Sequence, residues 1–562
     1  MDPVARMSGP RWRIENRQLL FDEQPALLLG GQLHNSTASS SLAAERAFAH
    51  AVALGANTVI APVTWDLFEP EEGSFDFSVA DALLSHAHTA DLRLVVLWFG
   101  AFKNAASTYA PRWVRADAER FPRAEVGAHD RPPFTYEGAT PKPVLSVFSP
   151  ALRDADGAAF EQFVRFLAEH PFRDRVALLQ VENEVGLLAD SRDRSAIAEA
   201  AWGSPVPDDF LAFLRGSAPE SIARSLWEAR GGAASGTWSE VLGEGWEADE
   251  VFMAWGFSTY VESLARRAAG IWPIPLYANA WLGPQPGQDR AGQYPSGGPG
   301  SRVLDVWRAG APSLSMLCPD IYVEEAGPVV RTYASADRAL FVPECRVRVA
   351  DIAMSLAQGA VGWSAFGLED VRVGSQVSQL LGQLTQIEPV LAAAQREGRV
   401  TAIVLGSGSE ERLVVGDVEL VARGTRALFE RMLLDAGVGH PVAAPPPPEE
   451  TQPGAAVASP HDTRPFGLIV DEGDDTFLVF GQGLTLDFFP AGSGGAAGSA
   501  GSAGVPAGPV IEYDSVVEGR FVDGAWAPGR SLNGDERLRI LPLDEIGAVR
   551  IRLVRVSGGM TP

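Results

Sequence analysis

The sequence predicts a (β/α)8 barrel followed by a C-terminal antiparallel β-sandwich-like domain. Up to residue 397, eight short apolar runs alternate with amphipathic segments, as expected for buried parallel strands and the helices that cover them. No glycine-rich dinucleotide-binding fingerprint accompanies these runs, which favours a closed barrel over an open doubly wound sheet. From residue 398 the apolar runs become β-branched and are punctuated by Gly and Asp, which is typical of antiparallel sheets.

The predicted barrel domain covers residues 1–397. Its eight strands are predicted at residues 25–32, 57–63, 92–100, 175–182, 274–280, 314–322, 339–344 and 360–367. Helices are predicted between them at residues 41–55, 78–90, 156–170, 250–269 and 375–394. Eight alternations of this kind match a barrel whose strands each lead into a helix.

The predicted β domain covers residues 398–562. Two segments of it are low in complexity: residues 442–460 are rich in Pro, and residues 491–508 consist mainly of Gly, Ala and Ser. Such compositions cannot bury enough apolar surface to form a core, so we expect an extended linker and a flexible loop there.

Composition and charge exclude several classes of partner and compartment. The net charge of −25 would repel nucleic acid and anionic membranes, so neither is expected as a partner. Two cysteines, Cys318 and Cys345, do not make a disulfide scaffold. The N-terminal residues contain no apolar signal-peptide core, and no apolar run reaches the roughly 18 residues of a membrane span. We therefore expect a cytoplasmic protein.

Two glutamates lie where a barrel enzyme carries its chemistry, at the carboxyl ends of strands. Glu184 follows the fourth predicted strand, and Glu344 ends the seventh. A retaining glycosidase needs one carboxyl group to protonate the leaving oxygen and a second, about 5–5.5 Å away, to attack the anomeric carbon. Asn183, just before Glu184, is placed to bind the sugar 2-hydroxyl. Aromatic side chains near the strand ends are candidates for stacking on a sugar ring: Trp65, Trp98, Trp281, Tyr322, Trp363 and Phe366.

Longer motifs resemble the β-galactosidases of glycoside hydrolase family 35. LQVENEVG (179–186) resembles the acid/base segment of that family. LLLGGQLHNSTASS, NTVIAPVTWDLFEPEEGSFDFS, LVVLWFGAFKNAASTYAPRWVR and ALFVPECR resemble its bacterial branch, in which a β domain follows the barrel. VVEGRFVDGAWAPGRSLNGDERLRI resembles that second domain, so the resemblance extends over both parts of the chain.

The resemblance implies a role for each matching residue. Glu184 would be the acid/base, Glu344 the nucleophile and Asn183 the partner of the 2-hydroxyl. The remaining matching positions would line the substrate pocket: Gln32, His34, Asn35, Trp65, Trp98, Lys103, Asn104 and Tyr322. Glu182 lies two residues before Glu184 and would share its side of a regular strand. Glu182 could compete for the acid role, but because the family pattern places the acid directly after Asn, we favour a structural role for it or one in support of the site residues.

The function implied is that of a retaining exo-β-galactosidase acting on galactoside oligosaccharides, including xyloglucan fragments of plant cell walls, with no cofactor and no metal. Two alternatives stay open. One is another retaining β-glycosidase on the same barrel: a β-glucosidase, mannosidase or arabinopyranosidase. The other is a carbohydrate-binding protein without turnover. The sequence leaves the oligomeric state open, with a homo-oligomer among the alternatives.

Overall fold

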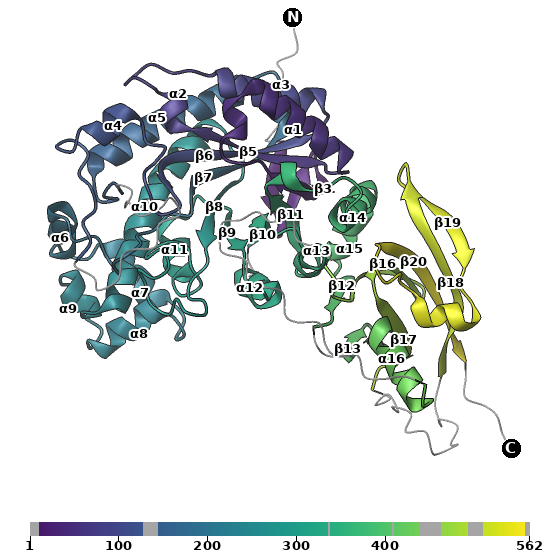
Figure 1. Ribbon diagram of the computed structural model, residues 1–562. Helices are drawn as coiled ribbons and strands as arrows, with labels where there is room; N and C mark the ends of the chain where they lie inside the picture. The colour runs from purple at the N-terminus through teal and green to yellow at the C-terminus, as the bar shows by residue number, and fades with distance from the viewer. Residues whose placement is uncertain are drawn as a thin grey trace, which may run out of the picture.

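The computed structural model describes residues 11–127, 144–334, 338–406, 410–438, 462–492 and 510–556. Its larger part is a closed barrel of eight parallel strands in the order β10-β11-β4-β5-β6-β7-β8-β9, which confirms the predicted fold class (Figure 1). The strands are β4 (Leu28–Gln32), β5 (Thr58–Thr64), β6 (Arg93–Lys103), β7 (Val176–Asn183), β8 (Leu276–Trp281), β9 (Met316–Ile321), β10 (Leu340–Cys345) and β11 (Ala360–Phe366). Each of them overlaps one of the eight predicted runs.

The inside of the barrel is a packed core. Leu28, Ile60, Leu97, Leu178 and Phe341 belong to one buried apolar cluster contributed by different strands. Large apolar side chains therefore fill the lower barrel, as in other barrels of eight strands. Any site for a ligand must lie at the end of the barrel where the strands finish in polar residues.

A small antiparallel sheet that the sequence analysis did not predict precedes the barrel. It consists of β1 (Trp12–Glu15), β2 (Gln18–Phe21) and β3 (Gln24–Ala26). Trp12 and Leu19 belong to the cluster that fills the barrel, and the indole of Trp12 donates to the carbonyl of Asp174, just before β7 (2.8 Å). The sheet therefore closes the amino-terminal end of the barrel. Residues 25–26, predicted as part of the first barrel strand, belong to this sheet instead.

The helices that cover the barrel agree with four of the five predicted segments: α1 (Ser41–Ala53), α3 (Ser78–Thr89), α5 (Pro150–Glu169) and α10 (Trp246–Ile271). The fifth prediction, one helix over residues 375–394, is wrong. The structure has α14 (Gln376–Leu384) and α15 (Glu388–Arg396), because Pro389 lacks the N–H needed to continue a helix and begins a new one instead.

The remaining helices are shorter and lie in the barrel domain, except for α16, which belongs to the C-terminal domain. They are α2 (Trp65–Phe68), α4 (Arg112–Ala116), α6 (Ala196–Trp202), α7 (Asp208–Gly216), α8 (Ile222–Ala229), α9 (Trp238–Leu242), α11 (Leu304–Gly310), α12 (Ala326–Tyr333), α13 (Val349–Ala357) and α16 (Thr425–Asp435). Helices α6 to α9 form an insertion between β7 and α10 (Figure 1). No helix in the described part of the chain is long and apolar enough to cross a membrane.

The C-terminal domain consists of two antiparallel sheets. The larger has six strands: β12 (Val400–Val404), β15 (Phe466–Gly473), β16 (Thr476–Gln482), β20 (Gly547–Val556), β18 (Val510–Val522) and β19 (Ala525–Ser531). The smaller has three: β13 (Glu410–Val415), β14 (Val418–Gly424) and β17 (Leu484–Pro490). Side chains such as Leu420, Ile469 and Val479 form a core between the sheets.

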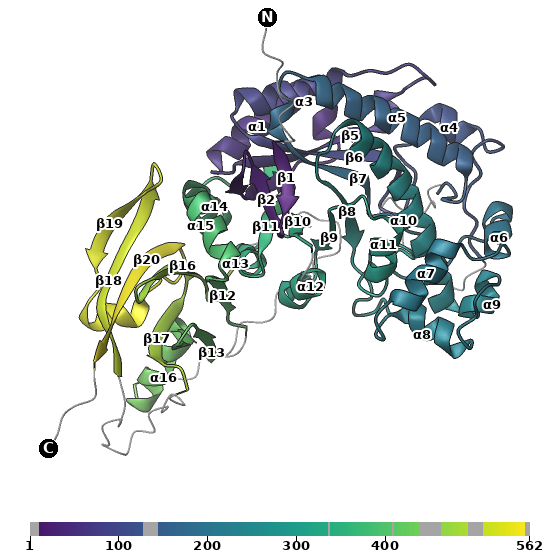
Figure 2. The same cartoon turned by 180° about the vertical axis from the view of Figure 1, so that it is seen from behind.

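The six-stranded sheet also packs on the barrel domain. Leu468 and Phe480 alternate along their strands with the core residues Ile469 and Val479, and join the apolar cluster of the barrel helices instead. Gln383 of α14 accepts a hydrogen bond from the backbone N–H of Phe521 (2.7 Å). Figures 1 and 2 show this domain beside α13, α14 and α15, at the side of the barrel.

The predicted flexible segment 442–460 lies outside the described residues, as does the segment 491–508 except for its first two residues. Cys318 and Cys345 are both free and buried, as expected for a chain without a disulfide framework.

Candidate active site

Three carboxyl groups meet at the mouth of the barrel. Glu184 follows β7, Asp320 lies near the end of β9 and Glu344 near the end of β10. One oxygen of each lies within 4.8 Å of one oxygen of each of the others. The residues are 6%, 2% and 6% exposed, so the charges interact in a largely water-free environment.

The backbone around Glu184 is bent so that its side chain enters this cluster. Regular β7 ends at Asn183, and Glu182 and Glu184 adopt left-handed conformations with φ of 61° and 44°. Such conformations cost about 1–3 kcal/mol each in a non-glycine residue and concentrate at functional sites. Hydrogen bonds hold the bend: the N–H of Glu184 donates to Oδ1 of Asn279 (2.9 Å), and its carbonyl accepts from the N–H of Ala105 (3.1 Å).

Glu184 is held as a weak acid. Burial raises the pKa of its carboxyl group to about 8, and the negative charge of Glu344 contributes to the same shift. Lys103 and a contact with Asp320 act in the opposite direction and lower this pKa. Glu184 is therefore mainly protonated at neutral pH, the state that a proton donor needs.

Glu344 has partners that favour its ionised form. Burial raises its pKa, but Lys103, the hydroxyl of Tyr322 and the side chain of Gln32 lower it. The Tyr322 hydroxyl donates to Oε1 of Glu344, whereas Oε2 has no hydrogen-bond partner. The unpartnered oxygen is the one available to a ligand.

Asp320 was not among the candidates chosen from the sequence, although it lies near the end of the sixth predicted strand. It pairs in register with Glu344 of the neighbouring strand β10, so the two side chains share the inner face. One of its oxygens accepts from Nδ2 of Asn279 (2.6 Å), and the other is buried without a partner. Burial and the charges of the two glutamates raise the pKa of Asp320 well above its usual value.

Asn183 is fixed by an amide network. Its Oδ1 accepts from Gln180 (3.0 Å) and from Asn279 (3.1 Å), and its Nδ2 donates to Asn104 (3.2 Å). Lys103 contacts the side chain of Asn104 in turn. The structure therefore brings the predicted residues Asn183, Lys103 and Asn104 together beside the carboxyl groups. Gln180 and Asn279, which position them, were missed because buried amides inside apolar runs carry no distinct signal in the sequence.

Three of the predicted tryptophans do not join this site. Trp98 is completely buried against Phe163 of α5, and its indole N–H donates to Asp156 (2.9 Å). Trp65 is likewise buried, with its indole N–H bonded to Glu69 (2.8 Å). Trp363 pairs in register with Leu29, and both belong to the cluster between strands and helices. The pocket assignments of Trp65, Trp98 and Trp363 are therefore corrected, because these side chains face the helix layer outside the barrel.

The other predicted residues lie around the mouth. Trp281 is half-buried and pairs in register with Asp320, which places it on the inner face. Gln32 ends β4 beside Glu344. His34 lies on the rim, where its Nε2 contacts Asp370 (2.8 Å), and Asn35 lines a separate cavity described below. His34 makes no hydrogen bond to the three carboxyl groups in the described structure.

Glu182 does not share the side of Glu184, contrary to the regular-strand expectation. The two left-handed residues turn their side chains apart. The carboxylate of Glu182 accepts from the N–H groups of Ala101 (3.1 Å) and Phe102 (2.8 Å) and lies next to Asp156. Glu182 thus braces the end of β6, in agreement with the structural role predicted for it.

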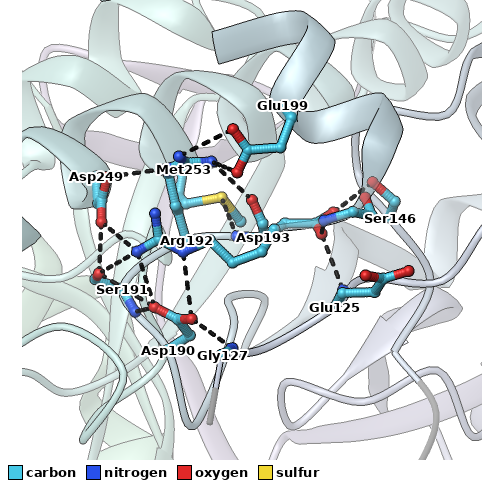
Figure 3. A network of polar contacts seen from close by, with 12 residues as sticks. Glu125, Gly127, Ser146, Asp190, Ser191, Arg192, Asp193, Glu199, Asp249 and Met253 are labelled. Carbon is cyan, nitrogen blue, oxygen red and sulfur yellow. Dashed lines mark hydrogen bonds and ion pairs between the residues drawn. The ribbon is translucent and has the colours of Figure 1, made fainter. Parts of the chain in front are cut away.

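The segment that follows Glu184 is anchored by a dense polar network (Figure 3). Arg194 bridges Asp190 (3.1 Å) and Asp249 of α10 (2.8 Å). Asp193 accepts from the hydroxyl of Ser146 (2.6 Å) and from the N–H of Glu125 (3.0 Å). These contacts tie the segment to α10 and to the loop that follows β6, so the residues after Glu184 are held in place.

The three carboxyl groups are also the one group of at least three His, Cys, Asp or Glu ligands close enough for a cation among the described residues. A metal ion would require all of them to be deprotonated. The raised pKa values of Glu184 and Asp320 oppose that state.

Comparisons with known proteins give the following similarities. The family described as a domain of unknown function, DUF5597, matches residues 377–542, from α14 into the β domain. No curated protein matches the chain. A β-galactosidase from Rahnella sp. R3 is a similar solved structure, with 15% identity and a TM-score of 0.43 over 65% of this chain and 57% of its own.

Two further solved structures show comparable similarity. The β-galactosidase from Bacillus circulans sp. alkalophilus has 10% identity and a TM-score of 0.47, over 94% of this chain and 99% of its own. The exo-β-1,4-mannosidase Op5Man5 from Opitutaceae bacterium strain TAV5 has 12% identity and a TM-score of 0.35, over 61% of this chain and 52% of its own. The match thus spans less than two thirds of the Rahnella and Opitutaceae proteins.

Proposed function

We propose that this protein is a retaining exo-β-glycosidase of β-galactosidase type. The observation that carries the proposal is the pair Glu184 and Glu344, which are buried, have oxygens within 4.8 Å of each other and differ in their surroundings. Inverting glycosidases need about 6.5–9.5 Å between the two carboxyl groups to admit a water molecule, whereas retaining enzymes need about 5–5.5 Å. Single oxygens within 4.8 Å of each other are compatible with the shorter separation of the two carboxyl groups, which supports attack by a carboxylate.

Burial raises the pKa of both glutamates, and Lys103, Tyr322 and Gln32 act against that rise at Glu344. Glu344, whose charge is favoured by Lys103, Tyr322 and Gln32, attacks the anomeric carbon and forms a glycosyl-enzyme ester. Glu184, with a pKa of about 8, gives its proton to the departing glycosidic oxygen. In the second step ionised Glu184 takes a proton from water, and the water oxygen displaces Glu344 with net retention.

The assignment of the sugar rests on the resemblance of the segments around Glu184 and Glu344 to family 35. We propose terminal β-galactosyl units of oligosaccharides as the substrate. Two observations at the site support a polyhydroxylated ligand: Asp320 and Glu344 each present an unpartnered oxygen, and half-buried Trp281 offers an aromatic face on the same side of the barrel. Sugars combine hydroxyl groups with apolar C–H faces that stack on such rings.

The decisive experiment is trapping with an activated 2-deoxy-2-fluoro-β-galactoside. The fluorine slows both steps, and the good leaving group restores the rate of the first step alone, so the ester should accumulate on Glu344 and be found by peptide mass spectrometry. Glu324→Gln, which changes an exposed glutamate outside the cluster, serves as the matched control and should be labelled like the wild type. Saturable sugar binding without any label on Glu344 would favour a binding protein.

A panel of nitrophenyl glycosides tests the sugar and the role of Glu184. Release from the β-galactoside should exceed release from the β-glucoside, β-mannoside and α-arabinopyranoside, and the opposite ranking would overturn the galactosidase assignment. Glu184→Ala should slow substrates with poor leaving groups far more than activated aryl substrates, since only the former need a proton. Equal losses on both would remove Glu184 from the acid role.

A further inference from the structure

A cavity of about 230 Å³ opens on the rim between the loop that follows β4 and the end of β5. Its walls include Asn35, Thr64, Asp66 and Tyr109, together with apolar Leu67 and Val79. None of the three clustered carboxyl groups lines it. The roles proposed above therefore leave this cavity unexplained.

Three residues that line this cavity each have a buried polar atom without a hydrogen-bond partner. These atoms are Oδ1 of Asn35, Oγ1 of Thr64 and Oδ1 of Asp66. Thr64 is only 7% exposed and lies on the same face of β5 as Ile60, the face that points into the barrel. Buried polar atoms are nearly always paired in folded proteins, and three unpaired acceptors around one space indicate that a ligand with hydroxyl donors completes them.

The walls of the cavity combine polar and apolar surface, as the hydroxyl groups and C–H faces of a sugar require. Leu67, which is 44% exposed, adds an accessible apolar side chain to the wall. Tyr109 adds a half-buried aromatic ring. Sugar-binding sites combine such apolar and aromatic surface for C–H groups with polar atoms for hydroxyl groups.

The cavity is connected to the proposed active site by a short chain of contacts. Thr64 pairs in register with Phe99 of β6. The ring of Phe99 lies 5.5 Å from the ring of Tyr109 on one side and 4.8 Å from Nζ of Lys103 on the other. Lys103 in turn acts on the charges of Glu184 and Glu344. Thr64 ends β5 at the end of the barrel where Glu344 lies near the end of β10, so the cavity and the carboxyl groups share the same end of the barrel.

A bare cation is a poorer fit. Calcium requires oxygen ligands at about 2.3–2.6 Å on several sides, and usually more than one carboxylate. This cavity offers one carboxylate, that of Asp66, and a volume of about 230 Å³ with apolar walls. Its size and mixed polarity suit an uncharged, hydroxyl-rich ligand.

We propose that this cavity is a subsite for a second sugar unit of the substrate, beyond the unit that is cleaved. The inference rests on the proposed glycosidase function and deepens it: the natural substrate is a neutral oligosaccharide, and Asn35, Thr64 and Asp66 select for its length by accepting or sharing hydroxyl protons of that unit.

The test compares two isosteric substitutions. Thr64→Val removes the unpartnered hydroxyl in the cavity, and Thr425→Val removes another buried, unpartnered hydroxyl in the distant β domain. For each variant, kcat/KM is measured on a galactosyl-terminated trisaccharide and on an aryl β-galactoside. Thr64→Val should lower the ratio of the two values roughly three- to tenfold, through KM of the trisaccharide. Thr425→Val should leave the ratio as in the wild type. Equal losses on the two substrates, or no loss, would overturn the subsite.

A binding measurement separates this inference from the proposed function. Calorimetric titration of the trisaccharide into Glu184→Gln and into the double variant Glu184→Gln/Thr64→Val does not need turnover. Weaker binding by the double variant supports the subsite even if no glycoside is hydrolysed. Equal binding by both overturns it, as does a thermal shift with calcium chloride that Asp66→Asn abolishes while the trisaccharide gives none.

Discussion

Two sets of buried carboxyl groups lie near the end of β7, and the hydrogen-bond partners of the two sets differ. In the pair Asp156 and Glu182, the oxygens accept from the indole of Trp98, the hydroxyl of Tyr260 and two backbone N–H groups. In the cluster of Glu184, Asp320 and Glu344, at least two oxygens have no partner. The comparison teaches that burial alone does not mark a reactive carboxyl group. Unsatisfied hydrogen-bonding capacity at the barrel mouth distinguishes the proposed active site from the structural pair.

The largest expected effect is that of Glu344→Ala. Removal of the nucleophile should lower kcat for aryl galactosides by roughly four to six orders of magnitude. Sodium azide should restore part of the rate by attacking the anomeric carbon from the vacated side, giving a galactosyl azide of inverted configuration, which NMR identifies. An azide product of retained configuration would show that a different residue forms the ester.

Asp320→Asn sharpens the comparison because activity and stability should move in opposite directions. Loss of a hydrogen bond to substrate should reduce kcat/KM roughly tenfold. Removing one of three buried carboxyl groups relieves their mutual repulsion. The free energy of unfolding, measured by urea titration at pH 7, should therefore rise by about 1 kcal/mol. A variant that is less stable than the wild type would place Asp320 with the structural carboxyl groups.

Glu182→Gln makes the corresponding change in the structural pair of Asp156 and Glu182. Both Glu182 oxygens accept from backbone N–H groups, and an amide can replace only one of them as an acceptor. The free energy of unfolding should fall by about 1–3 kcal/mol. The folded variant should keep its kcat within a factor of about three, since a structural group lowers stability without touching the substrate. A loss as large as that of Glu184→Ala, with stability unchanged, would reverse the two roles.

The smallest expected effect is a shift of the pH profile. Activity requires protonated Glu184 and ionised Glu344, so kcat/KM should fall as the pH rises through about 8, the pKa of Glu184. Lys103 lowers the pKa of both glutamates, and Lys103→Met should therefore move both limbs of the profile to higher pH. Arg46→Met, which removes an exposed charge on α1, should leave the profile in place. A shift to lower pH would contradict the assignment.

Much of the barrel could be predicted because local patterns specify it. Strands buried on both faces need continuous apolar runs, and each of the eight runs became a barrel strand. Local patterns did not predict two features of the fold. The strands β1 to β3 are only three or four residues long, too short for a periodic signal. The break between α14 and α15 depends on Pro389, whose effect was masked by apolar residues on both sides.

The sequence by itself determined the order of the strands and which polar residues end them, and thereby Glu184 and Glu344. Only the tertiary structure decided which side chains meet. It turned Glu182 away from Glu184, added Asp320 and Asn279 to the cluster, and moved Trp65, Trp98 and Trp363 into the helix layer. The direction in which a side chain points at a strand end depends on left-handed backbone conformations, on the register with neighbouring strands and on packing partners from distant strands. A local sequence pattern encodes none of these, which is the physical reason for the difference.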